Sequence, residues 1–348
     1  MVRVRLKLMV KTIFTLCLVG GCLKILTLDL KRKIKKAFPK VCKKDNSTAS
    51  NYTVDGSNPH DYKFLLNNPE KCAGSDVFLL IMVTSAPKNH AQRFAIRRTW
   101  GNENNIEGVV IKTVFAVGMA SNASNPIQAD LEQENRVHKD LIQEDFVDSY
   151  RNLTLKTVMC LKWASEFCPG AKFVLKADDD TFVNIFNLVR HLGRLNATQA
   201  KRFVTGRVYT GGKPVRIARD PTEERWCLAR EDFPRETFPR YPGGYAYVIS
   251  GDITRMVYEV SLTVQYLFIE DVYLGLCLEK LGIEPVYEDG FVFWREAHSC
   301  DFDKNFNMAS HRFKTPDAML GAWEGLLSKC RTVKPLLATT PTLRPPGH

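Results

Sequence analysis

Short runs of apolar and β-branched residues recur along the middle of the chain, and segments with helical spacing separate them. Residues 77–83, 109–117 and 173–175 have the character of buried strands, whereas residues 91–100 and 155–163 are typical of helices. Because strands and helices alternate, we expect an α/β fold in a single domain, with helices on both faces of a mostly parallel sheet.

A longer apolar segment lies near the N-terminus. Residues 12–23 carry no charge, and the apolar character resumes after Lys24. With its flanking lysines snorkelling, this segment approaches the roughly 20 residues that span a bilayer. We predict a signal-anchor transmembrane helix over residues 12–30, behind a cytoplasmic tail of residues 1–11. A cleaved signal peptide is the alternative, but a basic cluster rather than a site of small residues follows the apolar run.

N-x-S/T sequons orient this anchor, because all five follow it in the chain. They are Asn46, Asn51, Asn122, Asn152 and Asn196. We therefore expect a single-pass type II membrane protein with a glycosylated, lumenal body. Residues 31–71 are polar without periodicity and predict a stem, residues 72–330 predict the folded domain, and the proline-rich residues 331–348 predict a disordered tail.

Charge is concentrated at the N-terminal end. The whole chain has a net charge of +11, but residues 1–44 hold thirteen Lys or Arg against one Asp, and the remainder is close to neutral. A nucleic-acid-binding domain would carry its basic face on the folded part. The charge distribution therefore argues against nucleic acid as a partner.

Three adjacent carboxylates, Asp178, Asp179 and Asp180, directly follow the strand at 173–175. Such neighbours repel one another unless a cation neutralises them, and their oxygen ligands suit magnesium or manganese. The alternative is a solvated turn that caps the next helix. A metal at the end of a strand is able to hold a diphosphate leaving group, as in nucleotide-sugar transferases. Neither a P-loop nor a G-x-G-x-x-G motif is present.

Four segments resemble the β-1,3-galactosyltransferases and their β-1,3-N-acetylglucosaminyltransferase relatives of the Golgi, and the resemblance covers residues 72–330. They are R-x-x-I-R-x-T-W-G at 93–101, D-F-x-D-x-Y-x-N-L-T-L-K-T at 145–157, the D-x-D segment at 178–184, and E-D-V-x-x-G-x-C-L at 270–278.

The resemblance implies a GT-A type, Rossmann-like fold in the Golgi membrane and a manganese-dependent, inverting reaction. The expected reaction transfers galactose from UDP-galactose to GlcNAc or GalNAc on a glycoprotein or glycolipid glycan, in β-1,3 linkage. UDP-GlcNAc is the alternative donor. The Glu270–Asp271 pair resembles the galactosyltransferases, whereas the Gly243–Gly244 segment resembles the other branch.

Roles for individual residues follow from the same resemblance. Asp178 and Asp180 would bind the metal together with His311, for which His298 is the rival. Asp178, Asp179, Arg93 and Arg97 would bind the nucleotide, although salt bridges are an equal alternative for Arg93. Asp271 is the first candidate for the general base and Glu270 the second, with helix capping as the alternative for either.

Eight cysteines follow the anchor and allow 105 pairings. With the resemblance in hand, we expect Cys72 with Cys168, Cys300 with Cys330, and Cys227 with Cys277. Cys160, inside a predicted helix, would stay free. Cys42 lies in the stem, so a homodimer would form through the stem or through Cys42.

Two other classes of protein share some of these features. A lumenal calcium-binding lectin would use the acidic triplet but would not need a second acidic pair. A catalytically inactive relative acting as a chaperone or partner subunit would not need to keep either. Release of UDP from a UDP-sugar distinguishes all three classes.

Overall fold

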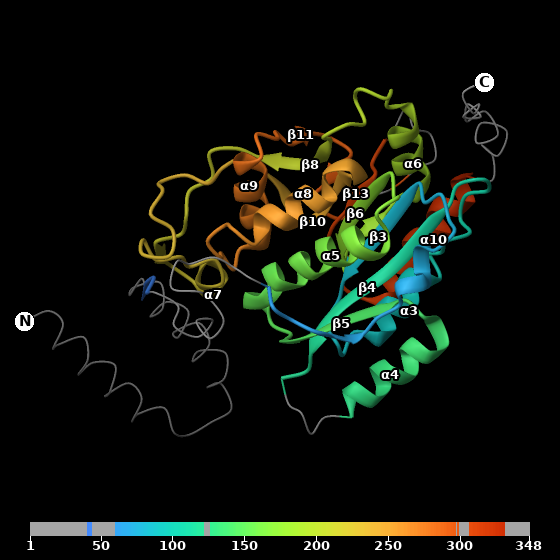
Figure 1. Ribbon diagram of the computed structural model, residues 1–348, viewed down its shortest axis with the longest axis horizontal. Helices are drawn as coiled ribbons and strands as arrows, with labels where there is room; N and C mark the ends of the chain where they lie inside the picture. The colour runs from blue at the N-terminus through green and yellow to red at the C-terminus, as the bar shows by residue number, and fades with distance from the viewer. Residues whose placement is uncertain (1–39, 44–59, 122–125, 297, 299–305, 331–348) are drawn as a thin grey trace, which may run out of the picture. The chain divides into compact units, whose positions relative to one another are not determined.

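The computed structural model describes residues 40–43, 60–121, 126–296, 298 and 306–330 (Figure 1). These residues form two compact units. The smaller comprises the described part of residues 1–46 together with 213–236, and the larger comprises the rest.

The larger unit is built on an eight-stranded sheet with the order β11-β8-β10-β6-β3-β4-β5-β2. Its central strands β6, β3, β4 and β5 are parallel, as is the β11–β8 pair at one edge, while β8, β10 and β2 join by antiparallel pairing. The predicted α/β class is therefore confirmed, and the sheet is mixed, with parallel strands at its centre. The strands are β2 (Phe64–Leu66), β3 (Leu79–Thr84), β4 (Ile111–Met119), β5 (Leu141–Val147), β6 (Phe173–Asp178), β8 (Val204–Tyr209), β10 (Tyr241–Ser250) and β11 (Val286–Tyr287).

Helices cover both faces of this sheet (Figure 1). The helices are α3 (His90–Arg97), α4 (Ile127–His138), α5 (Leu153–Phe167), α6 (Ile185–Arg194), α8 (Gly251–Ser261), α9 (Glu270–Lys280) and α10 (Pro316–Cys330), with short 3-10 turns η2 (Pro69–Cys72) and η3 (Tyr150–Asn152).

The two-residue period of β3 explains the layering. Leu79, Ile81 and Val83 point into a core shared with α3, α6 and α10, whereas Leu80 and Met82 point into a core shared with α5. A strand that is buried on both faces reads as a continuous apolar run, which is why the sequence revealed it.

A second, three-stranded sheet joins β12 (Phe291–Val292), β13 (Ala309–Ser310) and β7 (Phe182–Val183). Strand β7 follows the end of β6 after a short turn, and β13 pairs with it in antiparallel register. This small sheet brings a C-terminal segment to the carboxyl end of β6.

Residues 60–71 correct the predicted stem boundary. Strand β2 pairs with β5 in the main sheet, and the Trp163 indole donates a hydrogen bond of 2.8 Å to Asn67 Oδ1. His60 Nε2 lies 2.7 Å from the buried carboxylate of Glu144. The folded domain therefore begins by residue 60. Polar side chains such as His60 and Asn67 hold this segment to the domain, and for this reason an apolar pattern did not reveal it.

The disulfides agree with the prediction in part. Cys72 pairs with Cys168, joining η2 to the end of α5, and Cys160 is free, both as expected. The Cys227–Cys277 pairing is wrong, because Cys277 is a free thiol buried inside α9 and Cys227 pairs with Cys42. The Cys300–Cys330 pairing lies outside the residues whose side chains the structure describes.

The smaller unit explains the partner of Cys227. Strand β1 (Lys40–Val41) pairs with β9 (Ile217–Ala218), and the Cys42 N–H donates to the Arg216 carbonyl. This pairing leaves the α-carbons of Cys42 and Cys227 5.3 Å apart. A short helix, α7 (Pro221–Glu224), precedes Cys227. Because Cys42 is bonded within its own chain, the predicted homodimer through Cys42 is not supported.

The predicted tail and anchor, residues 1–30, and the predicted C-terminal tail lie outside the described residues. Within the part of the chain that is described, no helix combines the length and apolar character that crossing a bilayer requires.

Candidate active site

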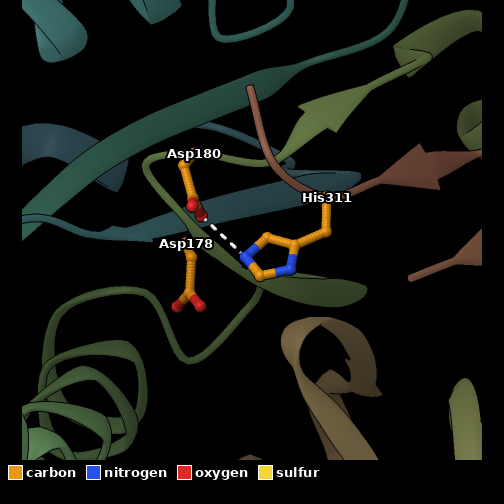
Figure 2. A group of neighbouring side chains, drawn as sticks. All are labelled: Asp178, Asp180 and His311. Atoms are coloured by element: carbon orange, nitrogen blue, oxygen red, sulfur yellow. Dashed lines mark ion pairs between the residues drawn. The ribbon is translucent and has the colours of Figure 1, made fainter. Parts of the chain in front are cut away.

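Three candidate metal ligands meet at the carboxyl end of β6 (Figure 2). Asp178 ends the strand, and Asp180 lies in the turn before β7. His311 directly follows β13, whose pairing with β7 carries the imidazole to the same turn. Ligand atoms of all three side chains lie within 4.8 Å of one another, and His311 Nε2 is 2.9 Å from Asp180 Oδ1.

This donor set fits a divalent cation. Two carboxylates and one imidazole suit manganese better than calcium or magnesium, which prefer oxygen alone. Each side chain is between 20% and 34% exposed, so a ligand from solvent is able to reach it. The His311 ring is oriented by stacking on Tyr245, at 5.3 Å between centroids and an interplanar angle of 17°.

Asp178 is fixed by its neighbours on the sheet. Thr84, its register partner on β3, donates a 2.8 Å hydrogen bond to Oδ1, and Lys176 donates one of 2.7 Å to the same oxygen. Burial alone would raise the pKa of Asp178, but the Lys176 ammonium outweighs it and lowers the pKa below its usual value. The carboxylate is therefore ionised and keeps Oδ2 for a cation.

Asp179 does not join this cluster. Its Oδ2 accepts hydrogen bonds of 2.7 Å from Ser85 Oγ and 2.9 Å from Asn89 Nδ2, which ties the turn after β6 to the segment before α3. Asp179 thus stabilises this turn, and its part in nucleotide binding stays a prediction. Adjacent residues at a strand end point in different directions, and the sequence does not show which of three acids turns inward.

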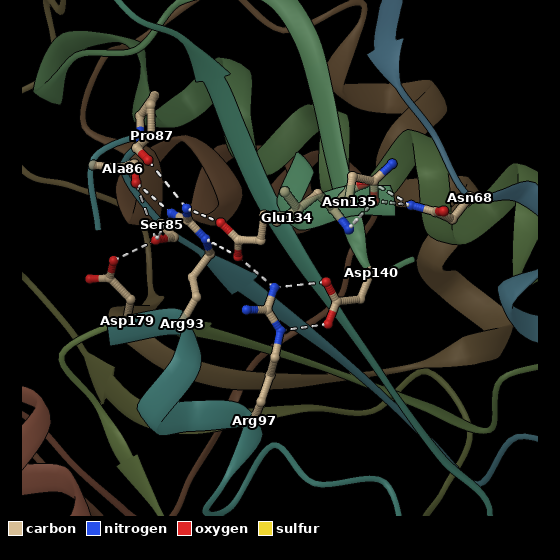
Figure 3. Close-up of polar contacts among 11 residues, drawn as sticks. Asn68, Ser85, Ala86, Pro87, Arg93, Arg97, Glu134, Asn135, Asp140 and Asp179 are labelled. Atoms are coloured by element: carbon tan, nitrogen blue, oxygen red, sulfur yellow. Dashed lines mark hydrogen bonds and ion pairs between the residues drawn. The ribbon is translucent and has the colours of Figure 1, made fainter. Parts of the chain in front are cut away.

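Arg93 and Arg97 form ion pairs with acids of the larger unit (Figure 3). Arg93 is fully buried and forms a two-pronged ion pair with Glu134 of α4, at 2.8 and 2.6 Å, and also donates to the Ala86 carbonyl. Arg97 pairs with Asp140 and with Glu134. Burial alone would raise the pKa of Glu134, but these arginines outweigh it and lower the pKa. The salt-bridge alternative for Arg93 is therefore confirmed. Arg97 is partly exposed and its Nη1 has no hydrogen-bond partner among the described residues, so its role in nucleotide binding stays a prediction.

The acidic pair at the start of α9 divides into two environments. Glu270 is buried, and its Oε1 accepts from Tyr247 at 2.8 Å and from Thr157 at 2.9 Å. Asp271 is partly exposed and, among the described residues, accepts hydrogen bonds from the backbone N–H groups of Gly244 at 3.2 Å and Val272 at 2.9 Å. Burial, with a smaller contribution from Glu270, raises the pKa of Asp271 to about 7. Asp271 is thus suited to take up a proton near neutral pH.

Two glycines of β10 lie in close contact with neighbouring elements. A Cβ on Gly244 would lie 2.7 Å from Glu270 Oε2, and one on Gly243 would lie 2.9 Å from the Tyr209 ring. Gly244 therefore gives room to the acidic pair, whereas Gly243 gives room to Tyr209 of β8.

Lys176, which contacts Asp178 and Glu270, is a residue of this site that the sequence analysis did not single out. The available signal was a lysine inside an apolar strand, since a buried lysine is nearly always paired. Burial would lower its pKa, but Asp178 and Glu270 outweigh this and raise it, so the ammonium stays charged.

His298, the rival metal ligand, lies in the interior. Its Nε2 is 2.7 Å from Ser310 Oγ, and its ring packs against Phe182 at 4.7 Å. Burial lowers the pKa of His298 to about 4, so it is neutral. Both observations describe a structural histidine.

Two of the predicted glycosylation sites lie in described segments. Asn196 and Thr198 are exposed. At Asn152 the side-chain amide donates to the Val147 carbonyl, and Thr154 of the same sequon is fully buried. Asn46, Asn51 and Asn122 lie outside the described residues.

The chain is similar to known glycosyltransferases. Residues 91–289 match the family model described as Galactosyltransferase. The chain is 39% identical over 285 residues to "Beta-1,3-galactosyltransferase 1" of Homo sapiens, covering 82% of this chain and 84% of that relative. It is 40% identical over 263 residues to "Lactosylceramide 1,3-N-acetyl-beta-D-glucosaminyltransferase" of Homo sapiens, covering 72% and 67% respectively.

Solved structures are more distant. The galactosyltransferase LgtC, solved with donor and acceptor sugar analogs, matches with a TM-score of 0.34 at 11% identity, covering 71% of this chain and 96% of that one. A glycosyltransferase involved in glycosylation of the PBCV-1 major capsid matches with a TM-score of 0.36 at 10% identity, covering 71% and 98%. Scores of this size carry no argument, so family membership follows from the sequence matches.

Proposed function

This chain belongs to the galactosyltransferase family, and we propose that it transfers galactose from UDP-galactose to GlcNAc or GalNAc on a glycan, with inversion, in β-1,3 linkage. The observation that carries the proposal is the cluster of Asp178, Asp180 and His311 at the end of β6, together with Asp271 on the neighbouring helix α9. Lys176 lies between the metal-ligand cluster and the start of α9, because its ammonium contacts Asp178 on one side and Glu270, the neighbour of Asp271, on the other.

Asp271 is the proposed general base. Its carboxylate takes the proton of the acceptor hydroxyl while that oxygen forms a bond to the anomeric carbon of galactose. The bond from this carbon to UDP breaks on the opposite face, and its electron pair leaves with UDP. A base whose pKa is about 7 is ionised in half of the molecules at neutral pH and is well matched to this task.

A divalent cation, which we propose to be manganese, would be held by Asp178, Asp180 and His311 and would neutralise charge on the departing diphosphate. Thr84 and Lys176 hold the ligand Asp178 in place before a cation binds. The stacked pair of Tyr245 and His311 does the same for the imidazole.

UDP-GlcNAc is the second candidate donor, because the chain is equally similar to a β-1,3-N-acetylglucosaminyltransferase. Galactose is preferred because the match to "Beta-1,3-galactosyltransferase 1" extends over more of both chains. A calcium-binding lectin is disfavoured by the family match and by the imidazole in the ligand set.

The test measures UDP release by the full-length chain purified in detergent. UDP-galactose and UDP-GlcNAc are compared with GlcNAc- and GalNAc-terminated acceptors, and the product linkage is determined. We expect release with UDP-galactose, loss of activity with EDTA, and recovery with Mn²⁺ beyond that with Mg²⁺. Release with UDP-GlcNAc alone would assign the second donor, and no release with either would overturn the enzyme proposal.

We also propose that the protein is a Golgi type II membrane protein with a lumenal active site. Two disulfides in the described residues fit an oxidising lumen, and the sequons follow the apolar segment. Any homodimer would form through the stem. Colocalisation with a Golgi marker tests the compartment, protease protection with glycosidase treatment tests the topology, and crosslinking tests the dimer.

A further inference from the structure

Lys176 lies where the metal-ligand cluster meets the acidic start of α9. The pairing of β6 with β10 places Lys176 directly opposite Tyr247. Lys176 and Asp178 are two residues apart on one strand, so their side chains lie on the same face of the sheet. Helix α9 presents Glu270 to that face, where Tyr247 binds it.

The Lys176 ammonium contacts acceptors on three elements. It donates to Asp178 Oδ1 at 2.7 Å and to the Gly244 carbonyl at 2.5 Å, and it lies 3.6 Å from Glu270 Oε2. The side chain is 7% exposed. The ammonium thus donates two hydrogen bonds and forms an ion pair with Glu270.

Gly244 extends this arrangement to the proposed base. Its carbonyl accepts from Lys176, and its N–H donates to Asp271 Oδ2 at 3.2 Å. The backbone has little room to shift, because even a Cβ at this position would lie 2.7 Å from Glu270 Oε2. One residue of β10 therefore connects Lys176 to Asp271.

We propose that Lys176 is a positioning residue that fixes the base Asp271 relative to the metal ligand Asp178, acting through the backbone of Gly244. This inference rests on the proposed function. The competing explanation is that Lys176 only neutralises the buried Glu270 and has no part in aligning the reacting groups.

The first experiment compares Lys176→Met with Lys172→Met, a matched control at an exposed lysine just before the same strand. Because a misplacement of about 1 Å costs about 100-fold in rate, we expect Lys176→Met to lower kcat by about 100-fold. The KM for UDP-galactose should change by less than about threefold, since Thr84 still holds Asp178. Lys172→Met should behave as the wild type. An unchanged kcat in Lys176→Met would overturn the proposal.

The second experiment separates alignment from charge balance. Lys176→Met leaves Glu270 buried without a counter-charge, which threatens folding. The double variant Lys176→Met/Glu270→Gln removes both charges and is compared with Glu270→Gln alone. The proposal expects the melting temperature to recover and kcat to remain about 100-fold below that of Glu270→Gln. If the two variants share the same kcat, or if the double variant does not fold, the proposal is overturned.

The wild-type assay distinguishes this inference from the proposed function. If the wild type releases no UDP from any UDP-sugar, the proposed function has failed. If the wild type is active and Lys176→Met turns over equally fast, the function stands and only the role of Lys176 is rejected.

Discussion

Two clusters of charged side chains lie in the larger unit, and they differ in how their charges balance. The arginine network joins Arg93 and Arg97 to Glu134 and Asp140, so two cations meet two buried acids. The active-site cluster has acids at Asp178, Asp180, Glu270 and Asp271, with Lys176 as the permanent cation among them. The charges of the arginine network balance, whereas the active-site cluster has a surplus of negative charge that a divalent cation would offset.

The difference teaches that a charged motif indicates function only when its charges are left without partners. Both clusters occur in segments that resemble the same family, and both contain closely spaced ionisable residues. A buried cluster with balanced charges holds elements together, while a partly exposed and unbalanced one is a candidate ligand site.

The largest expected effect is a loss of stability when the arginine network is disrupted. Arg93→Met leaves Glu134 buried and short of its main partner, so we expect a loss of about 3–5 kcal/mol in the free energy of unfolding. Activity per folded molecule should be retained. Urea denaturation gives the stability, and Arg98→Met, at an exposed position just after the same helix, is the control. A stable Arg93→Met variant that fails to bind UDP would restore the arginine to the nucleotide site.

The next largest effect is a loss of turnover when the active-site cluster loses its proposed base. Asp271→Asn removes the proposed base without changing the shape of the side chain, so turnover should fall by about 100-fold or more. The affinity for UDP and the free energy of unfolding should stay close to those of the wild type. Steady-state kinetics and calorimetric UDP binding measure the two quantities. Full turnover in both Asp271→Asn and Glu270→Gln would show that neither acid is the base.

A smaller effect is expected at the metal ligands. His311→Ala removes the one nitrogen of the cluster, so about tenfold more Mn²⁺ should be required for half-maximal activity. His298→Ala is the comparison, because its imidazole binds Ser310 rather than the acids, and its metal requirement should not change. An unchanged requirement in His311→Ala would remove that residue from the site.

The smallest effect is the pH dependence near neutrality. Since burial raises the pKa of Asp271 to about 7 and the base acts in its ionised form, activity should increase with pH through this range. Between pH 8 and pH 7, kcat/KM should fall by about twofold, and below pH 6 it should fall about tenfold per unit. A profile that is flat from pH 5 to 8 would contradict the assignment.

The sequence predicted the central sheet well because β3, β4 and β6 are buried on both faces and therefore appear as apolar runs. It did not predict β2, since that short edge strand follows a polar segment and is stabilised by contacts such as Trp163 with Asn67. A local sequence pattern predicts an element whose own residues are buried in the core. It does not predict an element that depends on contacts with residues far away in the sequence.

The candidate site, like the fold, was predicted in part. The structure brings Asp178, Asp180 and His311 together as expected, because a family pattern records residues that must meet in space. The sequence did not identify the partners of Arg93 and Arg97, because Glu134 and Asp140 lie about forty residues further along the chain and carry no signal of that contact. The Cys42–Cys227 pair was missed for a similar reason, since it depends on the pairing of β1 with β9.

The disulfide between Cys42 and Cys227 has a consequence for proteolytic release. It spans 185 residues of sequence, including everything from Cys42 to the end of α7. A single cut anywhere between these two cysteines leaves both fragments covalently joined. A protease that sheds a secreted form must therefore cleave before Cys42. If the predicted stem is cut after Cys42, the domain remains attached to its N-terminal segment until the disulfide is reduced.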